Sequence, residues 1–138
     1  MLTRCVEICP GAWNAMWGLG KARQALGEHV SALGWFERAL TYEPGNPDIC
    51  REATIEALGL GKAEKAVMHA RKACEIMPDN AGLQANFALA LLLNKQGNEA
   101  LEMIQKACRS SPDDPVNRNV LAYISDIVAG NQPYPDTI

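Results

Sequence analysis

The sequence predicts an all-α protein, an α-α superhelix in which antiparallel helical hairpins stack in line as a right-handed solenoid. Prolines stand at Pro10, Pro44, Pro78 and Pro112, at a constant interval of 34 residues. Between these prolines, apolar side chains recur at helical spacing. A constant interval of about 20 to 50 residues is typical of proteins built from stacked repeats.

Length and charge limit the classes of protein to which the chain belongs. Its 138 residues, 48% hydrophobic and 21% charged, fit one solenoid or globular domain. The formal net charge of −3 provides no extended basic surface for a phosphate backbone. We therefore expect no nucleic-acid partner.

The sequence also argues against a membrane segment and a cleaved leader. The longest strongly apolar run, residues 86–93, is much shorter than the roughly 18 residues of a membrane helix. Arg4 and Glu7 stand where a signal peptide has its apolar core. The odd number of cysteines, spread along the chain, fits a reducing compartment better than a disulfide framework. We expect a cytoplasmic location and no membrane partner.

The first interval, repeat 1 at residues 11–46, illustrates how each hairpin is expected to form. Apolar residues at helical spacing predict helices at 13–26 and 29–42. Gly27 between them suits the positive φ that helix C-termini favour. Pro44 ends the second helix because it lacks an amide hydrogen and disfavours helix in the preceding residue.

The next intervals repeat this plan as repeat 2 at 47–80 and repeat 3 at 81–114. Gly61 and Gly97 are expected to mark the turns between their helices. Because Gly97 stands two positions later than the interval requires, the first helix of repeat 3 is expected to be longer. The expected helices are 48–60, 63–76, 81–96 and 98–110.

The two ends of the chain depart from the plan. Residues 115–130 predict a C-terminal capping helix, followed by an extended tail at 131–138 that contains two prolines. The tail is expected to be a linker; alternatively, its Tyr134 occupies the groove of a neighbouring copy. Residues 1–10 match the second half of a hairpin, so they predict either the remnant of a preceding repeat helix or an N-terminal cap.

Small residues recur at two positions within the 34-residue repeat, and each such position is called a phase below. Ala32, Ala66 and Ala100 share one phase, and a second set of three alanines shares another. Small side chains let neighbouring helices approach closely, while larger neighbours fill the space beside them. The second set is Ala39, Ala73 and Ala107.

These residues resemble the tetratricopeptide repeat family, whose 34-residue unit is a pair of antiparallel helices. The resemblance covers nearly the whole chain up to about Gly130. In the first interval it is carried by Met16-x-x-Leu19-Gly20-x-x-Arg23, Ala32-x-x-x-Phe36, Ala39 and Pro44. It implies a solenoid of tetratricopeptide hairpins that acts as a protein-interaction module without enzymatic activity and binds a protein or peptide.

In this family the first helix of each hairpin lines a concave groove. Carried over position by position, the resemblance places these peptide-binding residues in the groove: Asn14, Trp17, Lys21, Gln24, Arg51, Ile55, Leu58, Ala85, Asn86, Leu89, Leu92, Asn119 and Tyr123. Cations near the start and aliphatic residues further along suit a peptide with a carboxylate and an apolar segment. Alternatively, Ile55, Leu89 and Leu92 belong to the core. Trp17 and Arg51 are expected to be dispensable for hairpin packing.

Other candidate chemistry is weak in this sequence. The cysteines and the two histidines, His29 and His69, lack the spacing of metal ligands or catalytic groups, so we expect no metal, no cofactor and no catalytic residue. We expect both histidines to be exposed or half-buried on second helices. The two "GLGK" strings lack the spacing of a phosphate-binding loop. Gly18 and Gly20 in the first string are better explained by close helix packing.

Two other functions remain open at this point. Apolar surface at the unfinished ends of the solenoid predicts a self-assembly scaffold, a possible homo-oligomer. Alternatively, the chain is the regulatory or substrate-recruiting part of a longer enzyme, such as a transferase, whose catalytic residues lie elsewhere. The sequence does not identify the ligand, because one fold serves many functions.

Overall fold

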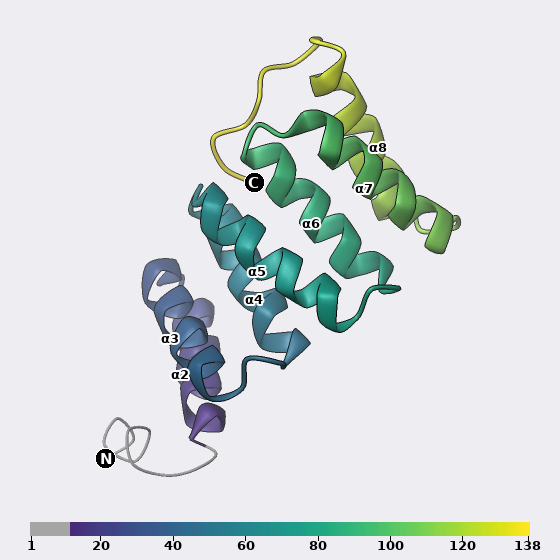
Figure 1. Cartoon of the computed structure of the whole chain (residues 1–138). Helices are drawn as coiled ribbons and strands as arrows, with labels where there is room; N and C mark the ends of the chain where they lie inside the picture. Colours follow the sequence, from purple (N-terminus) through teal and green to yellow (C-terminus); the bar gives the residue numbers. More distant parts are fainter. Residues whose placement is uncertain (1–11) are drawn as a thin grey trace.

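The chain folds as an all-α superhelix of stacked helical hairpins. The computed structural model describes residues 12–138, which contain helices and no strand (Figure 1). The expected remnant or cap at residues 1–10 lies outside the described residues. The helices are α2 (Trp13–Ala25), α3 (His29–Tyr42), α4 (Pro47–Gly59), α5 (Ala63–Ile76), α6 (Ala81–Leu93), α7 (Gly97–Ser110) and α8 (Pro115–Val128).

Side-chain caps define where the later hairpins and α8 begin. Asn46, Asn80 and Asp114 stand at the 34-residue interval, each in an extended conformation just before a helix. Each side-chain oxygen accepts a hydrogen bond from a backbone N–H of the following turn, with donor to acceptor distances of 2.9–3.0 Å for the shortest bond of each. These caps satisfy N–H groups that a helix leaves unpaired.

The turns between paired helices also follow the interval. Gly27, Gly61 and Lys95 have positive φ values of 76°, 72° and 62°. The backbone N–H after each of them donates to a carbonyl in the last turn of the first helix, as in Gln96 N to Leu91 O at 2.8 Å. Each turn therefore closes in the same way.

The expectation for repeat 3 was wrong at its turn. Helix α6 ends at Leu93, not at residue 96, and Gly97 is the first residue of α7. Lys95 takes the positive φ instead, although a residue with a Cβ is strained there. Gly97 has a different reason to be small: a Cβ at this position would meet the Tyr134 hydroxyl and Val128.

The packing of the helices defines an inner and an outer face. Each helix packs on its hairpin partner, and the second helix of a hairpin packs on the first helix of the next. The first helices also contact one another, α4 with α6 and α6 with α8, whereas the second helices described here have no comparable mutual contacts. The first helices therefore lie on the inner side of the arched chain and the second helices on the outer side.

The alanines of the two shared phases lie at the seams of this stack. All six have at most 1% of their surface exposed. The buried Phe36 and Ile104 fill the space beside them, at corresponding positions of α3 and α7. The core is therefore a continuous strip that follows the hairpins, as expected for a solenoid.

The C-terminal tail runs back along the chain after α8, shown in yellow in Figure 1. It has no regular secondary structure. Tyr134 is half-buried beside the α6–α7 turn, where Lys95 Nζ lies 5.7 Å from the centre of its ring. Further on, Ile138 N donates to Leu58 O at 3.0 Å. In this structure Tyr134 thus packs on its own chain, beside the α6–α7 turn.

Gly18 and Gly20 provide a matched test of close packing within one helix. A Cβ on Gly20 would lie 2.5 Å from Phe36 Cε1, whereas a Cβ on Gly18 would meet none of the described residues within 4 Å. Close packing therefore explains Gly20, but no described residue gives the same reason for Gly18.

We predict opposite effects of alanine at these two positions. Gly20→Ala should lower the free energy of unfolding by about 1–3 kcal/mol through overpacking against the buried Phe36 ring. Gly18→Ala should raise it by about 0.5–1 kcal/mol, since alanine favours helix over glycine. Urea denaturation of both variants measures the free energy of unfolding. Equal changes in this free energy would contradict close packing between Gly20 and Phe36.

Candidate functional site

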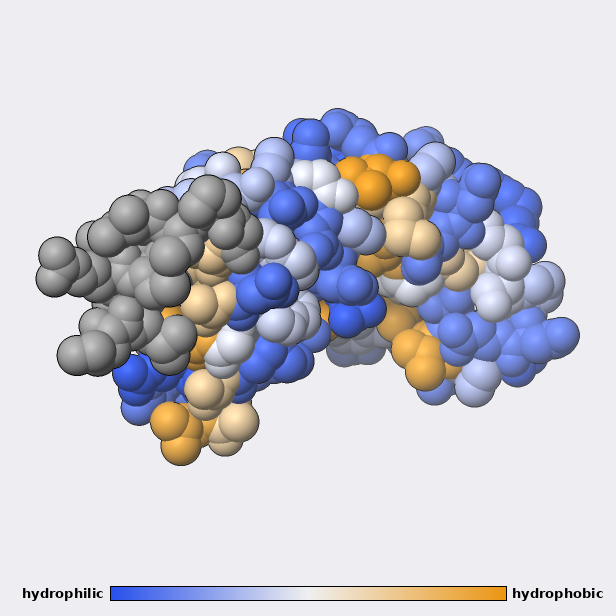
Figure 2. Space-filling model, turned by 90° about the horizontal axis from the view of Figure 1, so that it is seen from below, coloured by the Kyte–Doolittle hydropathy of each residue, from blue (hydrophilic) through white to orange (hydrophobic). Residues whose placement is uncertain are grey.

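A hollow of about 350 Å³ opens on the inner face, at the N-terminal ends of α4, α6 and α8. Met77, Leu83, Ala85 and Val116 give it apolar walls. Figure 2 shows the molecule from below, where its outline is arched and hydrophobic residues form small patches among hydrophilic ones. The surface therefore offers local apolar pockets within a polar face.

Polar side chains from three helices line the same hollow. Arg51 and Asp48 come from α4, Asn86 from α6 and Asn117 from α8, with the cap residue Asp114 before it. The structure thus brings together three of the residues expected in the groove: Arg51, Ala85 and Asn86. Asn117 was not among them.

A smaller hollow of about 190 Å³ lies between α2 and the start of α4. Its walls include Asn14 and Trp17, two further residues expected in the groove. Trp17 is half-buried, and its ring centre lies 5.5 Å from that of Phe36. The expectation that Trp17 is dispensable for hairpin packing was therefore wrong, because its ring covers the core.

A hydrogen-bonded network of carboxylates joins α2 to α4. Gln24 Nε2 donates to Glu52 Oε2 at 2.9 Å and to Glu56 Oε1 at 2.8 Å. His29 Nδ1 lies 2.7 Å from Glu56 Oε2. Glu52 and Glu56 are only 8% and 3% exposed, and buried carboxylates of this kind need such partners. Gln24 is therefore engaged within the chain.

The two expected groove cations are also engaged by carboxylates. Lys21 Nζ lies 3.5 Å from Glu52 Oε1, and Arg51 Nη2 lies 3.7 Å from the same atom. Arg51 Nη1 is in addition 3.5 Å from Asp48 Oδ1. Both cations are close to half exposed, so these pairs are weak. The pairs nevertheless leave no excess of positive charge on this part of the inner face.

The remaining expected groove residues divide between surface and core. Asn119 and Ile55 are exposed, and Leu89 and Tyr123 are half-buried. Leu58 and Leu92 are 5% and 0% exposed, so both belong to the core. For Leu92 the alternative assignment to the core therefore holds, whereas Ile55, at 42% exposed, lies on the surface.

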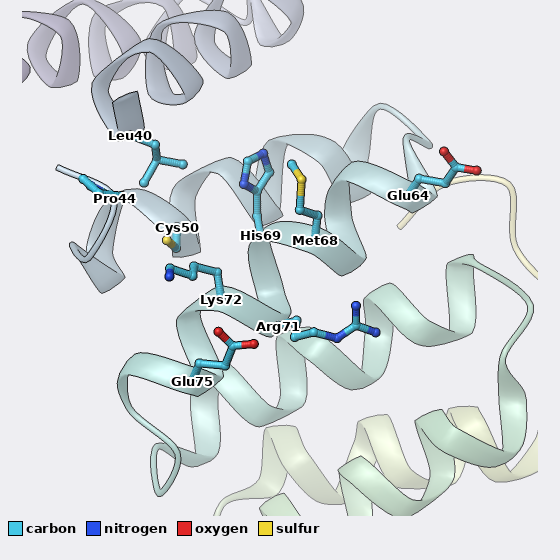
Figure 3. A pocket seen from close by; sticks show the side chains of 9 residues that line it. All are labelled: Leu40, Pro44, Cys50, Glu64, Met68, His69, Arg71, Lys72 and Glu75. Atoms are coloured by element: carbon cyan, nitrogen blue, oxygen red, sulfur yellow. The ribbon is translucent and has the colours of Figure 1, made fainter. Parts of the chain in front are cut away.

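A third hollow, of about 440 Å³, lies on the outer face between α3 and α5. Figure 3 shows Leu40 and Pro44 on one side and the side chains of α5 on the other, with the Cys50 sulfur between Pro44 and Lys72. Its charged residues are of both signs, as in Lys72 and Glu75. This hollow was not predicted from the sequence, because its shape depends on how two successive hairpins pack against each other.

His69, beside that hollow, takes part in an ion-pair network. Its Nε2 lies 2.9 Å from Glu37 Oε2, and Lys65 Nζ donates to Glu37 Oε1 at 3.0 Å. Burial opposes ionisation of Glu37, but the hydrogen bonds from His69 and Lys65 outweigh it, so the pKa of Glu37 lies below its ordinary value. His69 is buried, contrary to the expected exposed or half-buried position, and it joins α5 to α3.

Of the described cysteines, Cys50 and Cys74 belong to the core, whereas Cys108 is half-buried outside it. Cys50, Cys74 and Cys108 are free thiols. Burial raises the pKa of the Cys50 thiol and raises that of Cys74 to about 11. A thiol with a raised pKa is a poor nucleophile and a poor metal ligand at neutral pH. Cys5 and Cys9 lie outside the described residues.

Residues 12–138 contain neither a candidate metal site nor a candidate membrane span. No group of three or more histidine, cysteine, aspartate or glutamate side chains in this part of the chain could hold a metal ion. No helix in it is both long enough and apolar enough to span a membrane.

Comparisons of sequence place the chain among known proteins. The sequence profile of the tetratricopeptide repeat family matches residues 14–132. Bacteriophage adsorption protein A of Escherichia coli strain K12 is 26% identical over 132 residues, a match that covers 83% of this chain. The match covers 13% of that protein, so the chain spans only a small part of this relative.

Comparisons of structure identify similar folds at low sequence identity. A MamA double mutant has a TM-score of 0.82 at 18% identity, covering 95% of this chain and 72% of that one. The first domain of Spaghetti (RPAP3), bound to an HSP90 peptide, has a TM-score of 0.74 at 16% identity, covering 85% and 95%. A mutant of the Thermobaculum terrenum O-GlcNAc transferase has a TM-score of 0.71 at 18% identity, covering 81% and 22%.

We predict that Glu37 contributes to stability at neutral pH and that this contribution disappears in acid. Because its folded pKa is below the ordinary value of 4.5, the contribution is present above that value and is lost as the pH falls through the folded pKa. Glu37→Gln should lower the free energy of unfolding by about 1 kcal/mol at pH 7. The fall of stability below about pH 4.5 should also become less steep. Glu102→Gln, on the exposed surface of α7, is the control and should change neither quantity.

We predict slow alkylation of Cys74 in the native chain. With a pKa of about 11, roughly one thiol in a thousand is ionised at pH 8, against about one in four for a free cysteine. Iodoacetamide at pH 8 should therefore modify Cys74 roughly a hundredfold more slowly in the folded chain than in denaturant. Mass spectrometry of timed samples measures the rates, and equal rates in the two states would show that the thiol is not shielded.

Proposed function

The chain belongs to the tetratricopeptide repeat family, and we propose that it is a non-enzymatic interaction module that binds a peptide or protein segment along its inner face. The observation that carries the proposal is the hollow where Arg51, Ala85 and Asn86 meet. These residues come from two hairpins, so only the assembled stack forms the hollow. A segment lying across α4, α6 and α8 would contact all three helices at once.

The chemistry of the hollow suits a peptide. Apolar walls accommodate an aliphatic side chain, and the amide of Asn86 and the guanidinium of Arg51 are placed to hydrogen-bond a peptide backbone. A hollow of about 350 Å³ is at the lower end of the range for ligand sites, which suits a few residues of an extended segment. The similar RPAP3 domain, which is bound to an HSP90 peptide, supports this class of partner.

Self-assembly is a second candidate function. Leu26 and Val30, beside the α2–α3 turn, are 69% and 65% exposed, so both present apolar surface that a second copy could cover. Contact between copies through this surface would bury them. Sedimentation at high concentration tests this candidate, because a chain that stays monomeric does not assemble through this surface.

The proposed module also fits a role within a longer protein. The chain matches 22% of the similar transferase chain and 13% of the phage adsorption protein. In that setting it would recruit a substrate or partner for residues outside this chain. Three free thiols fit the cytoplasmic location that we propose.

We predict that Arg51 and Asn86 are needed for peptide capture. A phage-displayed library of random peptides about twelve residues long, selected on the immobilised chain, should yield peptides that bind. The double variant Arg51→Ala, Asn86→Ala should weaken binding of these peptides at least about tenfold, roughly 1.4 kcal/mol. Since Arg51 is exposed and Asn86 is half-buried, the fold should persist.

The matched control is the double variant Arg109→Ala, Asn98→Ala, which changes the same residue types on the exposed surface of α7. It should bind the selected peptides with unaltered affinity. The proposal fails if no peptide is enriched, or if the two double variants have the same affinity as the unmodified chain.

A further inference from the structure

Asn117 on α8 is buried without a hydrogen-bond partner for its amide nitrogen. The residue is 2% exposed, and its Nδ2 has no acceptor among the described residues. A buried amide without a partner is unfavourable, and native structures rarely retain one without a reason. The same side chain lines the hollow on the inner face, beside Asn86 and Asp114.

The repeat interval shows that this asparagine is an exception. The corresponding residues of the two preceding hairpins are Ile49 and Leu83, which are 0% and 5% exposed. Both are core residues, so the fold needs only an aliphatic side chain at this phase. Asn117 places an amide where the other hairpins place hydrocarbon.

The helix ends around the hollow offer few other free donors. The side chains of Asn46, Asn80 and Asp114 accept hydrogen bonds from N–H groups in the first turns of α4, α6 and α8. These caps occupy the N–H groups that would otherwise favour an anion. The amide nitrogen of Asn117 therefore stands out as a donor that the fold itself does not use.

The charge around the hollow is not positive. Arg51 lies within 3.7 Å of carboxylate oxygens of both Asp48 and Glu52. Asp114, on the opposite side, adds a further carboxylate for which the described residues provide no cation within ion-pair distance. This negative charge would repel a carboxylate of a ligand. It would not repel a neutral group, and it would attract a basic one.

We propose that this hollow takes a neutral or basic extended peptide segment, one main-chain carbonyl of which accepts a hydrogen bond from Asn117 Nδ2. An aliphatic side chain of the segment packs against Leu83 and Val116, and a lysine or arginine of the segment lies near Asp114. The inference rests on the proposed function and specifies its ligand class. It reverses the expectation of a carboxylate-bearing peptide, because that expectation was based on cations that the structure pairs with glutamate and aspartate.

The test uses the peptides selected by phage display, synthesised with amidated C-termini so that no terminal carboxylate remains. Fluorescence anisotropy of labelled peptides measures the dissociation constant for the full chain and its variants. We expect the selected peptides to be neutral or basic and to bind as amides. Selection of acidic peptides, or a requirement for the free C-terminal carboxylate, would overturn the inference.

Two substitutions test the role of Asn117. Asn117→Asp keeps the shape of the side chain and replaces the donor nitrogen with an acceptor oxygen, so it should weaken binding at least tenfold. Asn117→Leu restores the residue type of Leu83, so it should raise the thermal midpoint while also weakening binding at least tenfold. Asn98→Leu, on the exposed surface of α7, is the control and should leave the dissociation constant unchanged.

The outcomes separate this inference from the proposed function. If both Asn117 variants bind the amidated peptides as tightly as the unmodified chain, the inference is overturned, whereas loss of binding in the Arg51 and Asn86 double variant still supports the proposed function. If that double variant also binds normally, both fail. Circular dichroism shows whether Asn117→Asp is folded, and if it is not, the Asn117→Leu result alone decides.

Discussion

The close approach of helices at the alanine positions is the constraint on which the stack depends. Ala32, Ala66 and Ala100 have no exposed surface, and the second set of three alanines has almost none. A single hairpin cannot bury its apolar side, so each one is stabilised by its neighbours. Because caps, turns and alanines repeat at one interval, every hairpin presents the same shape to the next. The inner face is then free to vary without disturbing the stack.

The seam between α2 and α4 is held by polar side chains, not by close-packed alanines. There, Gln24 bridges Glu52 and Glu56 by hydrogen bonds, and α2 and α4 lack the close contact that α4 makes with α6. Two buried carboxylates are stable only with such partners. The contact between α2 and α4 therefore depends on the geometry of these hydrogen bonds as well as on burial. The functional consequence is electrostatic. The carboxylates engage Lys21 and Arg51, and the inner face loses the positive character that its cations alone would give.

The fold was predictable from sequence because its signals are local and repeated. Proline, a polar cap and a glycine turn each specify backbone geometry within a few residues, and the constant interval places them relative to one another. The sequence predicts the wrong end for α6 because glycine at position 97 indicates a turn, whereas Gly97 begins α7. The interval, not the residue type, fixes the turn, and Lys95 adopts the positive φ despite its side chain.

The charge of the inner face was less predictable. Lys21 and Arg51 stand at positions that the repeat assigns to the groove, but their partners become apparent only when α2 is placed beside α4. One signal was available: Glu52 and Glu56 are four residues apart, which puts both on one side of a helix. Sequence alone could not show that this side faces Gln24, because the relative placement of hairpins depends on packing across the seam.

Two buried polar residues differ in whether the chain compensates their burial. Glu52 and Asn117 are both polar and buried. Glu52 has partners within the chain, so its burial is compensated when the hairpins assemble. Asn117 Nδ2 has no acceptor among residues 12–138, so its desolvation cost is incurred on folding and a bound acceptor would offset it. Since such an acceptor binds only the folded chain, ligand binding and stability are linked at this residue, and a ligand would stabilise the hairpin seam beside α8.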